Sequence, residues 1–342
     1  MRMSLRDVIV IGAGPSGLSA AIAAKRRGLD YQVLEQGVLV NSIYRFPPQM
    51  VFFTTPELLE IGGLPFVSPY EKPTRLEALR YYRKVVDTFD LQIAYDETVT
   101  SVESERPRGA GTAGEAGGEE FFSIETRSSR GVRRSRDART VVFATGYYDH
   151  PVMLSIPGED LPHVSHFYGD PHPYYRKRVV VVGGGNSAAE AALELYRAGA
   201  SVTVVHRGPE MKSTIKYWVR PDIENRFKEG SIASRFNSLV QEIRPTSVII
   251  KTPDGTEDLP AEAVFLLVGY RADTDLFVRA GVRLTDREGP EHDPETFETN
   301  VPGLYVAGGA MAGVDTGTIF IENGRFHGEK IVQVIAARLG AG

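Results

Sequence analysis

The stretch Val8-Ile-Val-Ile-Gly12-Ala-Gly14-Pro-Ser-Gly17 decides the fold of this chain. Its apolar, β-branched beginning predicts a buried parallel strand, and the spacing G-x-G-x-x-G follows directly. An alanine-rich helix over 18–27 and a second strand over 31–35 come next, separated by Gly28. Strand, glycine turn, helix and strand in this order are typical of a dinucleotide-binding unit.

Each residue of this pattern has a mechanical reason. Gly12 makes the tight turn, Gly14 lets the backbone approach a pyrophosphate, and Gly17 lets the helix pack on the strand. The helix N-terminus offers free N–H groups and the positive end of its dipole to the phosphates. Glu35, at the tip of the second strand, is placed to accept hydrogen bonds from ribose hydroxyls and to repel a 2′-phosphate. The first site is therefore predicted to suit FAD or NAD and not NADP.

The pattern returns in Arg178-Val-Val-Val-Val-Gly183-Gly-Gly185-Asn-Ser-Ala188, followed by another alanine-rich helix and by a strand over 201–205. The tip of that strand is basic, with His206 and Arg207, and Lys212 follows. Arginine binds a 2′-phosphate through bidentate, charge-assisted hydrogen bonds, so the second site is predicted to bind NADP(H). Two such sites in one chain predict hydride transfer from a nicotinamide to a flavin.

The two fingerprints predict an α/β fold with two Rossmann-like dinucleotide-binding domains of the three-layer ββα type. The NADP domain is expected to be inserted into a discontinuous FAD domain. The predicted parts are 1–152 for the first part of the FAD-binding domain, 153–271 for the NADP(H)-binding domain and 272–342 for the second FAD part. Strands that end in Ala144-Thr145-Gly146 and in Gly308-Gly309 are expected to complete the first sheet beside the cofactor.

Several connecting segments have predictions of their own. Residues 36–48 are expected to form a loop along the bound dinucleotide, and residues 106–118 a flexible hairpin tip. Separate strands are expected over 132–138 and 140–144. The arginines between 127 and 139 favour a solvated hairpin.

Three further segments are expected to be helical. Apolar spacing predicts a helix over 74–89. A helical stretch is also expected over 211–227, with a break at Pro221. A third helix is expected to run from Thr316 or Thr318 through Phe326, with its N-terminus directed at the first sheet, where it would stabilise negative charge on a reduced flavin. The face predicted to be buried on the first of these helices is Leu76, Leu79, Tyr82 and Val86.

Composition excludes several function classes. A net charge of −5 gives no electrostatic footprint for nucleic acid. No apolar run approaches the roughly 20 residues of a membrane span, so a cytoplasmic protein is expected. The chain has no cysteine, which excludes disulfides, thiolate metal sites and a Cys-x-x-Cys redox pair. Its seven histidines show no metal-ligand spacing, so no metal site is predicted.

Beyond these patterns, the paired fingerprints resemble the two-dinucleotide-binding-domain flavoproteins of the thioredoxin reductase group. Four stretches, at 39–47, 53–60, 172–174 and 319–328, look like the bacillithiol-disulfide-reductase-like family of single-flavin NADPH oxidoreductases. This resemblance implies that electrons pass from NADPH through FAD to a low-molecular-weight disulfide such as bacillithiol disulfide. It also implies a homo-oligomer.

Three positions depart from the patterns of these families. The Cys-x-x-Cys of thioredoxin reductases is missing, and Ser16 stands where members of the closer family often carry a cysteine. Gly309 stands where the wider group usually has an aspartate that contacts the ribityl chain. Disulfides normally exchange through an attacking thiolate, which a serine hydroxyl cannot replace. Either the flavin reduces the disulfide directly, or the electrons leave by another route.

The sequence identifies no catalytic residue, and the first half-reaction, hydride transfer from nicotinamide to flavin, needs no side chain as acid or base. Residues predicted to bind the cofactor in the first and third segments are Gly12, Gly14, Pro15, Ser16, Gly17, Glu35, Gln36, Asn41, Ser42, Thr54, Val99, Ala144, Thr145, Gly146, Gly308, Gly309, Thr318 and Ile319. Those predicted in the middle segment are Gly183, Gly185, Asn186, Ser187, Ala188, His206, Arg207 and Lys212.

Four functions are compatible with these features. The first is an NADPH:disulfide oxidoreductase without a protein thiol, and the second is a reductase that passes single electrons to ferredoxin or flavodoxin. The third is a flavin monooxygenase, since 167–172 is similar to their Phe-x-Gly-x-x-x-His element, although the histidine comes one residue early. The fourth is a scaffold that senses NADPH without turnover. The expected partner is thus a small-molecule disulfide or a small electron-carrier protein.

Overall fold

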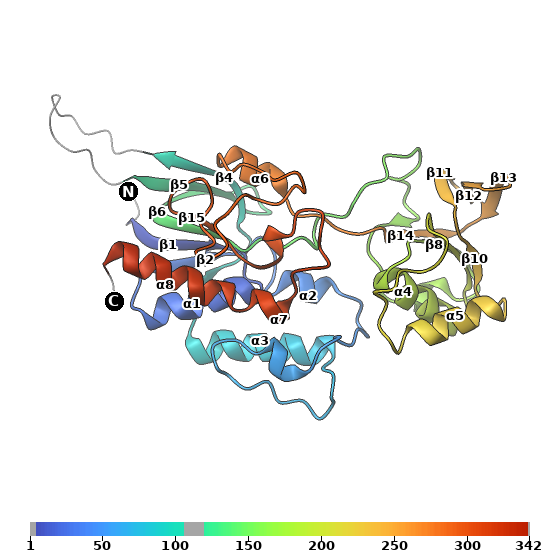
Figure 1. Cartoon of the computed structure of the whole chain (residues 1–342), viewed down its shortest axis with the longest axis horizontal. Coiled ribbons are helices and arrows are strands. Elements are labelled where there is room, and N and C mark those ends of the chain that lie inside the picture. Colours follow the sequence, from blue (N-terminus) through green and yellow to red (C-terminus); the bar gives the residue numbers. More distant parts are fainter. Residues whose placement is uncertain (1–4, 106–119, 341–342) are drawn as a thin grey trace. The chain divides into compact units, whose positions relative to one another are not determined.

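In the computed structural model, which describes residues 5–105 and 120–340, the chain divides into two units (Figure 1). The first comprises Met1–Arg45, Gln49–His150 and Tyr270–Gly342, and the second comprises Phe46–Pro48 and Pro151–Gly269. The α/β fold with an inserted second unit is as predicted. The hairpin tip predicted over 106–118 lies outside the described residues.

A seven-stranded sheet forms the centre of the first unit. Its strands are β1 (Arg6–Ile11), β2 (Tyr31–Leu34), β3 (Ile93–Ala94), β4 (Thr98–Glu105), β5 (Phe121–Arg127), β6 (Arg133–Phe143) and β15 (Leu304–Val306). They lie in the order β3-β2-β1-β6-β5-β4, and β15 also pairs with β6. β1, β2, β3, β15 and the end of β6 run parallel, so their carboxyl ends lie at one edge. The first glycine turn follows β1 at that edge.

One long strand, β6, joins the parallel and antiparallel parts of this sheet. Its first half pairs antiparallel with β5, from Arg133↔Arg127 to Ala138↔Phe122. From Ala138 onward it pairs parallel with β1, and its last residues also pair with β15. The prediction of separate strands over 132–138 and 140–144 is wrong, because the pairing of β6 continues without a break.

The helices of the first unit are α1 (Pro15–Arg26), α2 (Asn41–Arg45), η1 (Pro56–Leu59), α3 (Arg75–Phe89), α6 (Thr274–Arg279), η3 (Gly308–Met311), α7 (Ile321–Gly324) and α8 (His327–Leu339). α1 and α8 lie side by side (Figure 1). α2 interrupts the stretch 36–48, which was expected to be a loop. Within the described part of the chain, every helix is too short or too polar to cross a membrane.

The segment after β15 also differs from its prediction. The helix expected from Thr316 or Thr318 is wrong, because α7 spans only four residues and begins at Ile321. The Thr318 hydroxyl donates to the Asp315 carbonyl at 2.9 Å, and Asn323 Oδ1 accepts from the Phe320 N–H at 2.9 Å. These local bonds compete with helical pairing and hold a turn before Ile321.

Helix α3 is as predicted, and of the four residues predicted on its buried face only Tyr82 is among its buried residues. Thr74 and Glu77 form a capping box at its start. Leu76, expected inside, is 48% exposed. The tyrosines turn inward because their hydroxyls donate to backbone carbonyls of the segment around η1. The buried residues of α3 are Ala78, Tyr81, Tyr82 and Val85.

The second unit contains two sheets. The parallel sheet has the order β10-β9-β8-β14-β7, with β7 (Val164–Ser165), β8 (Arg178–Val182), β9 (Ser201–Val205), β10 (Ala233–Arg235) and β14 (Ala263–Leu266). The antiparallel sheet consists of β11 (Leu239–Arg244), β12 (Ser247–Thr252) and β13 (Gly255–Pro260). The helices are η2 (His172–Tyr174), α4 (Asn186–Arg197) and α5 (Arg220–Lys228).

Strand β8 shows how these elements form three layers. Val179 and Val181 pack in one core with the alanines of α4. Val180 and Val182 pack in a second core with Val248 and other residues of the antiparallel sheet. Alternate residues of one strand thus face a helix and a sheet, which is the predicted ββα arrangement. The helix expected from 211 begins only at Arg220, because proline is favoured in the first helical turn.

Arg136 and Glu97 form a buried ion pair in the first unit. Their side chains are 6% and 5% exposed, and two hydrogen bonds of 2.6 and 2.8 Å join them. Burial alone raises the pKa of Glu97, but the bonds from Arg136 and Thr126 outweigh it and hold that pKa below its ordinary value. The prediction of a solvated arginine hairpin is therefore wrong for Arg136.

We expect Arg136→Ala to lower the free energy of unfolding by about 3–5 kcal/mol, because it removes the buried partner of the Glu97 carboxylate and leaves only Thr126 and the partly exposed Arg134. The measurement is urea denaturation at pH 7. Because the pKa of Glu97 is depressed, the stability that the pair contributes is lost as pH falls, so the difference from wild type should shrink below about pH 4. Arg130→Ala, an exposed arginine of the same hairpin, is the control. Equal losses in the two variants would contradict a buried pair.

Candidate functional site

Two glycines of the first turn are required by backbone packing. Gly12 has φ +109°, and a Cβ there would lie 2.4 Å from the Ala144 carbonyl oxygen. A Cβ on Gly17 would lie 2.0 Å from the Gly12 carbonyl oxygen. The end of β1, the start of α1 and the residues after β6 therefore touch through backbone alone.

Gly14 is different, because no packing requires a glycine there. A Cβ on Gly14 would meet no described atom within 4 Å, and its φ of −78° and ψ of 176° suit any residue. Beside the turn, the Thr145 hydroxyl is buried without a hydrogen-bond partner among the described residues. An open backbone at a helix N-terminus and an unsatisfied hydroxyl next to it fit a bound phosphate-containing cofactor.

Glu35 links the glycine turn to the segment after β2. Its two carboxylate oxygens accept from the N–H groups of Ala13 and Gly37, each at 2.8 Å, and the residue is 5% exposed. Burial raises the pKa of Glu35 despite those two bonds, and the charge of Asp149 raises it further. Each oxygen retains acceptor capacity, so the carboxylate can still receive ribose hydroxyls.

Asp149 gathers polar side chains from the α2 region. Its carboxylate accepts from Gln36 Nε2 at 3.1 Å, from Asn41 Nδ2 at 3.4 Å and from Arg45 Nη1 at 2.5 Å. Gln36 and Asn41 were predicted to contact a cofactor, and here their amides contact Asp149. Sequence reasoning missed Asp149 as an organising residue, because it stands in an ordinary turn and its partners lie far back in the chain.

The C-terminal segment meets the first glycine turn at Ser16. Gly308 has φ +63°, and a Cβ there would lie 2.3 Å from Ser16 Oγ. A Cβ on Gly309 would lie 2.8 Å from the Tyr147 ring. The space that an aspartate would need at position 309 is thus taken by a tyrosine, which explains this departure from the wider group in packing terms.

The other residues of the first unit that were predicted to bind cofactor do not share one structural role. Thr54 is buried, Val99 packs against the core of the sheet, and the Thr318 hydroxyl is used in its own turn. Arg325, which was not predicted, donates to the carbonyls of Glu57 and Glu60 at 2.6 and 2.8 Å. It therefore ties together two of the stretches on which the family resemblance rests. Pro15 is the first residue of α1, and Gly146 has a left-handed backbone with φ +69°. Ser42 lies in α2, and Ile319 lies just before α7.

The second glycine turn repeats the first. Gly183 has φ +146°, and a Cβ there would lie 2.4 Å from the Leu267 carbonyl oxygen and 3.1 Å from Ala188 Cβ. Gly185 has an ordinary extended conformation, and a Cβ on it would meet no described atom within 4 Å. Packing therefore requires a glycine at position 183, as it does at Gly12, whereas no described atom crowds Gly185.

Basic residues surround the tip of β9. The His206 ring packs against Gly184 and is 9% exposed. Burial, followed by the charges of Lys212 and Arg207, lowers the pKa of His206, so the ring stays neutral near pH 7. Arg207 and Lys212 are exposed, and within the described residues neither side chain has an ion pair or hydrogen bond. Two unneutralised cations close together favour an anionic ligand.

Asn186 holds the segment that carries Lys212. Its Nδ2 donates to the Thr214 carbonyl at 3.1 Å, and its Oδ1 accepts from the Lys216 N–H at 2.8 Å. The Lys212 N–H in turn donates to the Gly184 carbonyl at 2.8 Å. The amide of Asn186, predicted to bind cofactor, is therefore engaged with protein, while Ser187 is exposed beside it.

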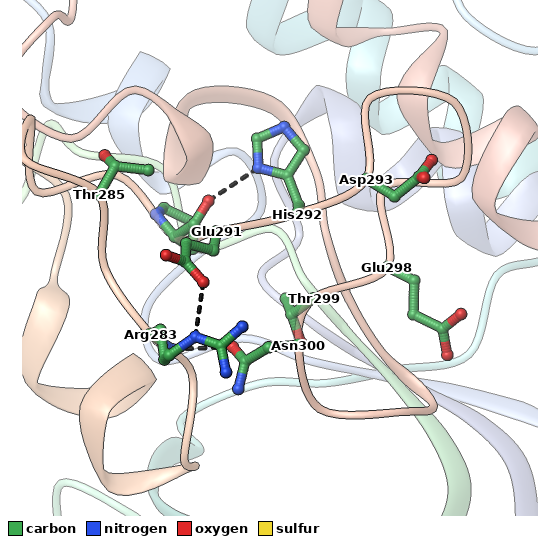
Figure 2. A pocket seen from close by; sticks show the side chains of 9 residues that line it. Arg283, Thr285, Glu291, His292, Asp293, Glu298, Thr299 and Asn300 are labelled. Carbon is green, nitrogen blue, oxygen red and sulfur yellow. Dashed lines mark hydrogen bonds and ion pairs between the residues drawn. The ribbon is translucent and has the colours of Figure 1, made fainter.

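A pocket of about 490 Å³ lies elsewhere in the first unit, and none of the predicted residues lines it. Figure 2 shows Arg283 paired with Glu291 and the His292 ring bonded to the Pro290 carbonyl. Of the carboxylates that line this pocket, Glu291 pairs with Arg283 and Glu298 pairs with Arg338. No group of three or more His, Asp or Glu in residues 5–105 and 120–340 is arranged to hold a metal ion.

Comparison with known proteins agrees with this geometry. The family model of the pyridine nucleotide-disulphide oxidoreductases matches residues 9–308. Bacilliredoxin reductase Bdr of Bacillus subtilis is 41% identical over 98% of this chain and 99% of its own length. The solved structure of bacillithiol disulfide reductase Bdr (YpdA) from Bacillus cereus is 38% identical over 98% of this chain and 100% of its own, with a TM-score of 0.92.

More distant relatives share the fold. The structure of thioredoxin reductase from Lactococcus lactis is 23% identical, covers 97% of this chain and 98% of its own, and has a TM-score of 0.73. The predicted resemblance to both families is therefore confirmed. Members of the matching family use FAD and NADPH, the two cofactors predicted from the sequence. The chain belongs to the pyridine nucleotide-disulphide oxidoreductases, and it is an oxidoreductase.

Proposed function

We propose that this protein passes electrons from NADPH through FAD to a low-molecular-weight disulfide, such as bacillithiol disulfide, without a thiol of its own. The observation that carries the proposal is the nearly full-length likeness to bacilliredoxin and bacillithiol disulfide reductases in a chain with no cysteine. The bound cofactors supply the hydride donor and the electron carrier. The protein supplies binding, orientation and exclusion of water.

The first glycine turn suits FAD. The open backbone at Gly14 and the N–H groups at the start of α1 would hold the pyrophosphate. Glu35 would accept the ribose hydroxyls, and the Thr145 hydroxyl would gain the partner that it lacks among the described residues. Because both oxygens of the buried Glu35 accept from backbone N–H groups and the charge of Asp149 lies close by, a 2′-phosphate is disfavoured there.

The second glycine turn suits NADPH. Gly185 and the start of α4 would hold the pyrophosphate, and Arg207 with Lys212 would hold the 2′-phosphate. His206 adds no charge, but its ring fills the space under Gly184 and supports the turn. We also propose that the FAD-binding and NADP(H)-binding domains meet at 152/153 and at 271/272. The protein is further proposed to be cytoplasmic and to form a homo-oligomer.

The alternative electron acceptor is a small electron-carrier protein such as ferredoxin. Ferredoxin–NADP reductase of Ignicoccus hospitalis is 25% identical over 89% of this chain, and electron transfer to a small carrier protein needs no thiol. The flavin monooxygenase from Stenotrophomonas maltophilia is 22% identical and shows a shared fold alone.

Under anaerobic conditions, one equivalent of NADPH should bleach the visible absorbance of the protein-bound flavin. Adding bacillithiol disulfide should then restore that absorbance rapidly and release thiol, because no protein cysteine is needed. In flavin-loaded Ser16→Ala, the disulfide should still restore the flavin absorbance, since a serine hydroxyl does not exchange with disulfides. A flavin that stays bleached with the disulfide but recovers with oxidised ferredoxin would instead support the electron-carrier function.

The two open glycines give a reciprocal test of cofactor placement. Gly14→Val should fold but lose bound flavin, because a Cβ there meets no described atom within 4 Å and stands where the pyrophosphate is expected. Gly185→Val should keep its flavin and lose reduction by NADPH. The measurements are the flavin absorbance of the purified variants and the rate of bleaching. A folded Gly14→Val protein that retains its flavin would contradict the first assignment.

Arg207→Ala should lower kcat/KM for NADPH by roughly 10- to 100-fold, because it removes charge-assisted bonds to the 2′-phosphate. The kcat/KM for NADH should change little, so the preference for NADPH over NADH becomes smaller. Steady-state reduction of the flavin with each nucleotide measures both. Arg244→Ala, which removes an exposed arginine from β11 of the same unit, is the control. An unchanged preference in Arg207→Ala would refute this role.

A further inference from the structure

His327 makes one hydrogen bond to the backbone of the first site. Its Nδ1 lies 3.1 Å from the nitrogen of Gly308, at the end of β15. A peptide N–H can only donate, so Nδ1 must be the acceptor, and the ring proton must be on Nε2. Protonation of Nδ1 would replace this bond by two opposed donors. The contact therefore exists only for the neutral imidazole.

Neighbouring side chains fix the orientation of this ring. Phe297 stacks on His327 with ring centroids 4.6 Å apart and planes 24° apart, and its own φ is +60°. His292 stacks on Phe297 at 6.3 Å, and the Lys330 amino group lies 5.9 Å from the Phe297 ring. Burial, then the charges of Lys330 and His292, lowers the pKa of His327 to about 4. The ring is therefore neutral at neutral pH.

Gly308 connects this ring to the first glycine turn. Its N–H stands at the start of η3, where helical partners are missing, so the imidazole satisfies a group that the fold leaves open. On its other side, Gly308 lies directly against Ser16 Oγ. Gly328, the residue after His327, has equally close contact with the backbone of α1, since a Cβ there would lie 2.3 Å from the Ala20 nitrogen.

We propose that His327 is a positioning residue of the flavin site, which holds the N–H of Gly308 and thereby keeps the turn at Gly308–Gly309 against Ser16. The proposal rests on the proposed function, because it takes the first glycine turn as the FAD site. His327 has no role of its own in electron transfer. Its contribution is the fixed placement of backbone at the edge of that site.

Two variants separate the hydrogen bond from the bulk of the ring. His327→Leu fills similar space but offers no acceptor, and we expect the holoenzyme to bind FAD about tenfold more weakly. His327→Asn places an amide oxygen near the position of Nδ1, so binding should return to within about threefold of wild type. Release of fluorescent flavin on dilution measures the affinity. His292→Asn, at the far end of the stack, is the matched control and should bind FAD as wild type does.

Several outcomes test whether the acceptor of His327 supports FAD binding. Wild-type FAD affinity in His327→Leu would overturn the proposal, and so would equal losses in the Leu and Asn variants, because the acceptor would then not matter. If the Leu variant does not fold, ¹⁵N NMR of histidine-labelled wild type gives the answer. The resonance missing in His327→Asn identifies His327, and an unprotonated Nδ1 near pH 7 supports the proposal, whereas a protonated one refutes it.

Failure of the proposed function has a different signature. It would appear as a Gly14→Val protein that keeps its flavin. Failure of the present inference would appear as a His327→Leu protein that keeps its flavin affinity while Gly14→Val loses its flavin.

Discussion

The first unit depends on direct contact between three backbone segments. A Cβ on Gly12 would overlap the Ala144 carbonyl, and a Cβ on Gly17 would overlap the Gly12 carbonyl. With no side chain between them, the end of β1, the residues after β6 and the start of α1 are held at fixed positions. This places the N-terminus of α1 at the carboxyl edge of the parallel strands, where ligands bind in open α/β sheets. Two groups lie directly beside that contact: Glu35, which accepts from the Ala13 N–H, and Thr145, which follows Ala144.

The second unit builds the same turn and then differs in its electrostatics. Glu35 is buried, and two backbone N–H groups fix the direction of its carboxylate oxygens. Arg207 is exposed, and no described group neutralises it. A fixed anion excludes a phosphate, while a free cation attracts one. In the proposed assignment, these two strand tips distinguish the FAD site from the NADPH site.

Features formed by residues close together in the sequence were predicted, whereas contacts between residues far apart in the sequence were missed. The glycine turns, their strands and their helices follow from spacing within short windows, and the structure has them. Asp149 bonds with Gln36 across 113 residues, and Arg136 pairs with Glu97 across 39, and no periodicity connects such partners. The helix expected after Thr316 failed for another reason. Side-chain bonds from Thr318 and Asn323 to nearby backbone compete with helix formation, and apolar patterns do not register them.

Because the chain has no cysteine, the residues around the first glycine turn cannot take part in thiol–disulfide exchange. Position 16, where relatives resembling this chain often carry a thiol, lies between Gly308 and Gly324, and a Cβ on either would come within 3.1 Å of the Ser16 hydroxyl. That hydroxyl is neither ionised nor a soft nucleophile, so it cannot form a mixed disulfide. All redox steps must then occur on the cofactors and the acceptor. The protein's part in those steps is then to bind and orient the cofactors and to exclude water, and the close backbone contacts around Gly12, Ser16 and Gly308 fix the position of the first glycine turn.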